Sequence, residues 1–226
     1  MHEQNIRNES IELWHGSSVI LPSPEFGKGK RYNDYGLGFY CTQDLELAKE
    51  WSCASLDHDG FANHYSLDIK GLKILDLSSS RYSILHWLSV LISNRTFQLS
   101  TPVAEQGVEY LHERYPVNTD AYDIIVGYRA DDSYFSFAKA FLNNAITIEQ
   151  LSQAMELGDL GKQIVLKSKT SFSRIRYLGY EIAEASLYYE KKLLRDGSAR
   201  DKYRQEIRNA NINGTYLIDL IREGRR

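Results

Sequence analysis

The 226-residue chain has a nearly balanced charge, with 27 Lys and Arg against 30 Asp and Glu, and only two cysteines. A formal charge of −3 gives no general attraction to nucleic acid or to an anionic membrane. Two cysteines make no disulfide framework, so we expect a cytoplasmic protein rather than a secreted mini-protein. Segment 1–12 is polar and unlike a signal peptide. No apolar run approaches the ~20 residues that span a bilayer.

The first third of the chain predicts short strands around a glycine-rich loop. Residues 11–15 are short and largely apolar and precede a glycine, which is typical of a buried strand. Residues 21–38 hold prolines and several glycines, so we expect a loop that crosses over the site. Residues 39–42 predict a second strand, and Thr42 is a good N-cap for the helix after it. Two β-rich runs within 65–77 predict a hairpin.

The remainder alternates between helical and extended patterns. Helical spacing predicts helices over 83–91, 103–115 and 131–142, and β-rich runs predict strands over 123–127 and 163–166. Thr147 and Gln150 resemble a capping box. Beyond Ala183 we expect one or two long helices with Leu187, Leu194 and Ile207 on one face. The pattern predicts an α+β protein, with a domain over 1–182 and a helical extension over 183–226 packed on it.

Two motifs carry the chemistry: LWHGS over 13–17 and DYGLGFYCT over 34–42. The imidazole of His15 can donate to a hydroxyl group of a bound ligand while its other nitrogen accepts locally, and Tyr40 offers a rigid stacking face. Gly16 permits close approach of a flat ligand, and the closely spaced glycines before Tyr40 indicate a bulge or a tight ligand contact. Each of these residues also has a plainer structural interpretation. His15 could hydrogen-bond a neighbouring carbonyl, Tyr40 could be an aromatic core residue, and Asp34 could fix the loop by an Asx-turn.

Together with LAKEW over 47–51, these motifs resemble the opening strands and helix of poly- and mono-ADP-ribosyltransferases of the His-Tyr class. The chain is most similar to a bacterial family of uncharacterised ADP-ribosyltransferase-like proteins, often paired with small partner genes as toxin–antitoxin modules. Segments 122–132 and 163–168 extend the resemblance, which covers about residues 11–180. It implies a split β-sheet core with flanking helices, and NAD as substrate.

The resemblance also implies roles for individual residues. His15 would position the ribose, Tyr40 would stack on the nicotinamide, and Gln163 stands where many relatives have a catalytic Glu. The other positions implied to contact NAD are Gly16, Ser17, Gly38, Asp131 and Asp132. The neutral amide of Gln163 cannot offer a full charge to an oxocarbenium-like state, which favours mono-transfer over polymer elongation.

The missing charge has several candidate sources. Asp131 or Asp132 could supply it, although both suit capping of the following helix equally well. Glu181 is a further substitute. A metal is not expected, because His58 and His64, with acidic neighbours, lack ligand spacing. The basic, glycine-containing segment 27–31 lacks the frame of a P-loop.

Three functional hypotheses follow. The first is a mono-ADP-ribosyltransferase acting on a protein, RNA or DNA, with a toxin or defence role and a neutralising antitoxin as partner. The second is a module of the same fold that binds NAD or ADP-ribose without turnover, which Gln163 motivates. The third is an interaction protein that docks a partner through its helical tail. None involves a membrane.

Overall fold

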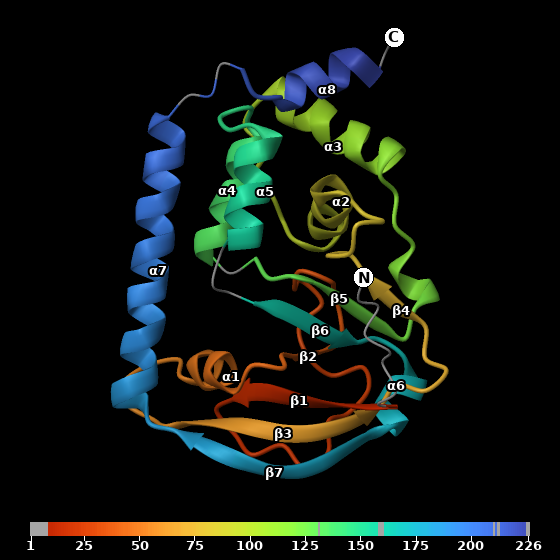
Figure 1. The fold of residues 1–226 in the computed structure, drawn as a ribbon, viewed down its shortest axis with the longest axis vertical. Coiled ribbons are helices and arrows are strands. Elements are labelled where there is room, and N and C mark those ends of the chain that lie inside the picture. The colour runs from red at the N-terminus through yellow and green to blue at the C-terminus, as the bar shows by residue number, and fades with distance from the viewer. Residues whose placement is uncertain (1–8, 131, 158–160, 210, 212, 225–226) are drawn as a thin grey trace, which may run out of the picture.

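The computed structural model describes residues 9–130, 132–157, 161–209, 211 and 213–224. Two β-sheets lie one above the other, and most helices lie beyond the second sheet (Figure 1). The strands are β1 (Ser10–Ser17), β2 (Phe39–Cys41), β3 (Gly60–Asp68), β4 (Ile74–Asp76), β5 (Ile124–Tyr128), β6 (Lys162–Leu166) and β7 (Ile175–Ala183). The helices are α1 (Leu45–Ser52), α2 (Ile84–Asn94), α3 (Pro102–Arg114), α4 (Asp132–Leu142), α5 (Ile148–Leu157), α6 (Lys169–Ser173), α7 (Ala185–Arg208) and α8 (Leu217–Gly224), with a 3-10 turn at Thr119–Ala121.

The two sheets are joined at the edge where β1 meets β2. The first sheet has the order β1-β3-β7 and is antiparallel, and the second has the order β2-β6-β5-β4 with β4 and β5 parallel. An isolated bridge connects them, with Trp14 N donating to Thr42 O at 2.7 Å and Thr42 N donating to Trp14 O at 2.9 Å. This bridge brings Trp14 of β1 beside Thr42, directly after the end of β2.

The second sheet is buried on both faces. Successive residues of a strand point to opposite sides, so each of its strands contributes side chains to two different cores. Ile164 and Leu166 of β6 belong to the core between the sheets, with Phe39 of β2. Val165 belongs to the core under the helices, against which Tyr40 also packs. Alternation therefore places Tyr40 and Gln163 on the helix side of this sheet.

The predicted α+β class is confirmed, but the predicted hairpin within 65–77 is wrong. Strand β3 pairs with β1 and β7, whereas β4 lies in the other sheet and pairs with β5. Between them Gly71 has φ +70°, a conformation that glycine adopts without strain. Helix α1 is capped by Asp44, whose Oδ1 accepts from Leu47 N at 3.1 Å, and not by Thr42.

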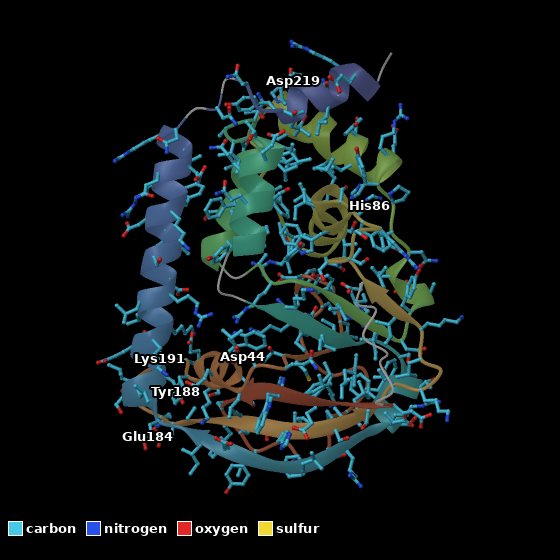
Figure 2. All side chains as sticks on the ribbon, viewed as in Figure 1. Asp44, His86, Glu184, Tyr188, Lys191 and Asp219 are labelled. Atoms are coloured by element: carbon cyan, nitrogen blue, oxygen red, sulfur yellow. The ribbon has the colours of Figure 1, made fainter. Side chains whose placement is uncertain are left out.

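Helix α7 packs along α1 and α4 through polar and aromatic contacts. Figure 2 shows Tyr188 and Lys191 at the end of α7 beside α1, where both reach Glu46, at 3.0 and 2.8 Å. The expected apolar stripe does not make this contact: Leu187, Leu194 and Ile207 are exposed by 47%, 74% and 37%. None of the described helices is long and apolar enough to cross a membrane.

Candidate functional site

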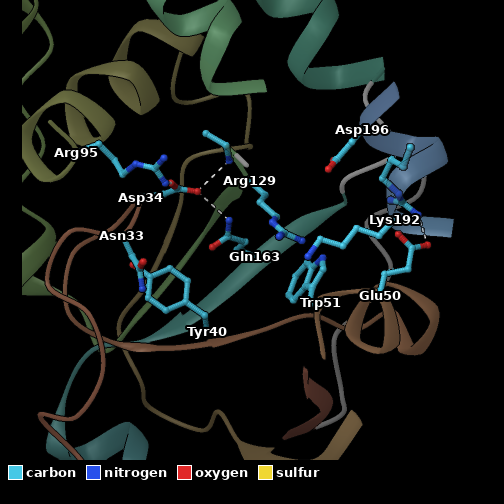
Figure 3. Close-up of a pocket in the computed structure, with 12 residues that line it drawn as sticks. Asn33, Asp34, Tyr40, Glu50, Trp51, Arg95, Arg129, Gln163, Lys192 and Asp196 are labelled. Carbon is cyan, nitrogen blue, oxygen red and sulfur yellow. Dashed lines mark hydrogen bonds and ion pairs between the residues drawn. The ribbon is translucent and has the colours of Figure 1, made fainter. Parts of the chain in front are cut away.

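A cavity of about 340 Å³ lies at the β2–β6 edge of the second sheet, between α1 and α7 (Figure 3). Tyr40 and Gln163, two residues singled out in the sequence, both line it. The loop before β2 contributes Asp34, helix α1 contributes Trp51, and the end of β5 leads into Arg129. The fold therefore collects polar and aromatic side chains from distant parts of the chain around one opening.

Tyr40 holds the loop that precedes it. Its hydroxyl donates to Gly36 O at 2.6 Å and accepts from Tyr35 N at 3.1 Å. Burial raises the pKa of the phenol, which therefore stays protonated at neutral pH. With both ends of the hydroxyl satisfied, the ring is left as a rigid wall of the cavity. Its stacking on nicotinamide stays a prediction.

His15 is tied to Tyr40 through the backbone. Its Nδ1 lies 2.7 Å from Tyr40 O. Because a carbonyl only accepts, Nδ1 must carry the proton and donate. Burial lowers the pKa of the imidazole, and this hydrogen bond opposes the shift only in part, so the ring is neutral and Nε2 has a lone pair. We expected His15 to donate a hydrogen bond to a ligand; this geometry instead leaves Nε2 as a nitrogen that can only accept one.

The two motif residues lie on different sides of β2. The His15 ring packs on Phe39 with centroids 4.4 Å apart, and Phe39 belongs to the core between the sheets. The Tyr40 ring lies on the helix side, and His15 is not among the residues that line the cavity. The structure thus places Tyr40 and Gln163 in the cavity, whereas the His15 side chain lies on the other side of β2 and is joined to Tyr40 only through its backbone carbonyl.

Gln163 is buried, and its amide is fixed by Asp34. Gln163 Nε2 donates to Asp34 Oδ2 at 2.9 Å, and the same oxygen accepts from Ala130 N at 2.9 Å. Asp34 Oδ1 accepts from Arg95 Nη1 at 3.1 Å. Burial raises the pKa of Asp34, and the hydrogen bonds and Arg95 oppose that rise. The expected Asx-turn is wrong, since the carboxylate reaches across the site instead of capping its own loop.

A group of residues at the far side of the cavity is not predicted by the sequence motifs. The guanidinium of Arg129 lies 4.2 Å from the centroid of the Trp51 ring, in cation–π contact. Glu50 of α1 pairs with Arg195 of α7 at 2.7 Å. Lys192 also lines this side. Trp51 belongs to the LAKEW segment, but its helical spacing suggested only core packing.

The sequence model of one protein family matches residues 11–177, and its description is "Protein of unknown function (DUF3990)". The chain belongs to this family. No curated protein and no solved structure matches it. The DUF3990 segment contains His15, Tyr40 and Gln163, whereas α7, which supplies one wall of the cavity, lies beyond it.

Two glycines of the DUF3990 segment are explained by packing. A Cβ on Gly16 would lie 2.1 Å from Ala48 O, so β1 approaches helix α1 closely at this point. A Cβ on Gly38 would lie 2.6 Å from Val165 Cγ1, so this residue lets β2 lie against β6. Close backbone approach is a recurrent reason for glycine in a strand. Contact of either glycine with NAD stays a prediction.

Of the remaining predicted positions, the structure describes the side chains of Ser17 and Glu181, and neither lines the cavity. Ser17 Oγ accepts from Val19 N at 3.2 Å. Asp131 lies outside the described residues, as does the side chain of Asp132, whose backbone begins α4. Glu181 pairs with Lys49 at 2.7 Å and does not line the cavity. Among the residues that the structure describes, no three His, Cys, Asp or Glu side chains form a candidate metal site.

Proposed function

We propose that this protein is a mono-ADP-ribosyltransferase that transfers ADP-ribose from NAD to a macromolecular acceptor. The observation that carries the proposal is that Tyr40 and Gln163, two of the three motif residues, line the same cavity. His15 is hydrogen-bonded to the backbone of Tyr40, and the Tyr40 ring lines one cavity with Gln163. Two separate sheets that meet where β1 bridges to β2 are compatible with the split-sheet core of the ADP-ribosyltransferase-like fold.

The reaction breaks the bond between nicotinamide and C1′ of the ribose, and a nucleophile of the acceptor then bonds to C1′ and loses its proton. Positive charge develops on the sugar in between, as in other glycosyl transfers. Tyr40 supplies a flat wall for the leaving nicotinamide, and the neutral His15 accepts from a ribose hydroxyl. Gln163 contributes an amide dipole, which stabilises that charge less than a carboxylate would.

The charges around the cavity suit a dinucleotide. Four basic side chains line it against three acidic ones: Arg95, Arg129, Lys192 and Arg195 against Asp34, Glu50 and Asp196. Guanidinium groups bind phosphate oxygens in a bidentate manner, which fits the diphosphate of NAD. The volume of about 340 Å³ is within the range of small-molecule sites.

The direct test uses NAD that carries a label in its adenylate part. The labelled NAD is incubated with the protein and a bacterial lysate. We expect the label to enter macromolecules, and sensitivity to protease or to nuclease to identify the acceptor class. Tyr40→Ala should abolish labelling while the chain stays folded. Saturable NAD binding without transfer or nicotinamide release would instead favour the binding module that Gln163 motivates, and no NAD binding would favour the interaction protein.

The toxin role rests on the family resemblance and has its own test. Expression in a bacterial host should arrest growth, and Tyr40→Ala should relieve the arrest at equal protein level. Arrest by the Tyr40→Ala variant would separate toxicity from NAD chemistry. The co-purifying protein, if one neutralises the activity, would be the antitoxin.

A further inference from the structure

Position 163 lacks an acidic residue, yet a carboxylate lies directly behind it. Asp34 and Gln163 are each only 5% exposed, and Gln163 Nε2 donates to Asp34 Oδ2 at 2.9 Å. Both residues line the cavity. They are 129 positions apart in the chain, so the contact is made by the fold and not by a local turn.

The carboxylate determines which way the amide points. An ionised carboxylate only accepts, so the amide nitrogen must face Asp34 and the amide oxygen must face away. Figure 3 shows this arrangement, with the Gln163 oxygen turned from Asp34 toward the side of Tyr40. Within the described part of the chain, Gln163 Oε1 accepts no hydrogen bond and is not a buried orphan atom. Oε1 is therefore an acceptor open to the cavity.

Asp34 is itself held firmly. Ala130 N donates to Oδ2 at 2.9 Å, and Arg95 Nη1 donates to Oδ1 at 3.1 Å. A hydrogen bond from an amide to a carboxylate polarises the amide, which increases the negative charge on its oxygen, and a buried setting strengthens this effect. The hydrogen bond from Gln163 to Asp34 thus makes Gln163 Oε1 more negative, and the charge of Asp34 can act on a ligand through this oxygen.

We propose that Asp34 is a positioning residue that orients and polarises Gln163, so that Gln163 Oε1 stabilises the positive charge developing on the ribose of NAD. The pair would take the place of the catalytic Glu that the family resemblance implies at position 163. This inference rests on the proposed function and specifies how its site works without an acidic residue at 163.

The test measures nicotinamide release from NAD in the presence of acceptor lysate for wild type, Asp34→Asn, Gln163→Met and the exchange Asp34→Asn/Gln163→Glu. Asp34→Asn should lower kcat about tenfold to a hundredfold, as loss of an orienting partner does, with little change of KM. Gln163→Met should lose at least as much. The exchange variant should recover part of the activity, because its carboxylate at position 163 faces the ligand and its amide at position 34 can donate to that carboxylate, at the cost of the hydrogen bond from Ala130 N. Asp57→Asn, on an exposed loop, is the matched control for loss of one acidic charge.

The outcomes separate the two proposals. Wild type that releases no nicotinamide refutes the transferase and the role of Asp34 with it. If the wild type is active and folded Asp34→Asn has an unchanged kcat, the role of Asp34 is refuted and the transferase proposal is not. If Asp34→Asn fails to fold, Gln163→Met decides: a wild-type kcat there overturns the inference. Recovery by the exchange variant supports it, since a purely structural Asp34 would not be rescued by a carboxylate at 163.

Discussion

His15 Nδ1 donates to the backbone carbonyl of Tyr40 across 2.7 Å. One hydrogen bond thereby joins the two residues that carry the family resemblance, and it does so beside the Trp14–Thr42 bridge between the two sheets. The bond assigns the proton of the neutral imidazole to Nδ1 and leaves Nε2 as an acceptor. The histidine thus has a defined tautomer before any ligand binds.

The lowered pKa of His15 predicts a pH dependence of stability. Burial keeps the folded imidazole neutral, whereas the unfolded chain takes up a proton near pH 6.5. Because the unfolded state binds more protons, the free energy of unfolding should fall as the pH drops through about 6.5 toward the lower folded pKa. His15→Gln should reduce this slope in urea unfolding between pH 5.5 and 8.

His86 also has a pKa lowered by burial. Because wild type and His15→Gln both contain His86, only the difference between their curves of unfolding free energy against pH reports on His15. Parallel curves for wild type and His15→Gln would contradict the assignment of a neutral, buried imidazole.

Trp51 offers a spectroscopic test of the cavity. Its indole lines the cavity in contact with Arg129, so a bound nucleotide should change its fluorescence. We expect NAD to change the emission of wild type and of Trp14→Phe, but not that of Trp51→Phe. Trp14 is the control because it stacks on His64, with centroids 3.9 Å apart, and does not line the cavity. An NAD-dependent change that survives in Trp51→Phe and disappears in Trp14→Phe would place the ligand elsewhere.

Two glycine substitutions should change stability in opposite directions. Gly16→Ala would drive a methyl group into Ala48 O, with 2.1 Å available, and should cost about 1–3 kcal/mol of unfolding free energy. Gly197→Ala in helix α7 meets no described atom within 4 Å and should stabilise by about 0.5–1 kcal/mol. Thermal or urea unfolding of both variants checks this. A stable Gly16→Ala protein would show that β1 and α1 are not in such close contact.

Features set by neighbouring residues could be predicted from the sequence. The capping box at Thr147 and Gln150 is confirmed, with Thr147 N donating to Gln150 Oε1 at 3.0 Å and Gln150 N to Thr147 Oγ1 at 3.3 Å. Strand β6 was also predicted, because its apolar run is contiguous. Both signals lie within a few residues, where periodicity and capping chemistry act.

Features set by residues that are distant in the chain could not be predicted from the sequence. The partner of β4 is β5, 50 positions along, and no local pattern distinguishes this pairing from a hairpin with β3. Asp34 finds its three partners 61 to 129 positions away. Helix α7 binds through ion pairs rather than its leucines, so hydrophobic spacing pointed to the wrong face. The cavity is a product of these long-range contacts.

The most direct test of the central proposal is nicotinamide release from NAD by purified protein freed of any neutralising partner and incubated with cell lysate. We predict release that depends on lysate, falls about a hundredfold or more in His15→Ala, and is unchanged in His58→Ala, a loop histidine that is exposed. Absence of release from folded wild type, or full release from His15→Ala, would contradict the account.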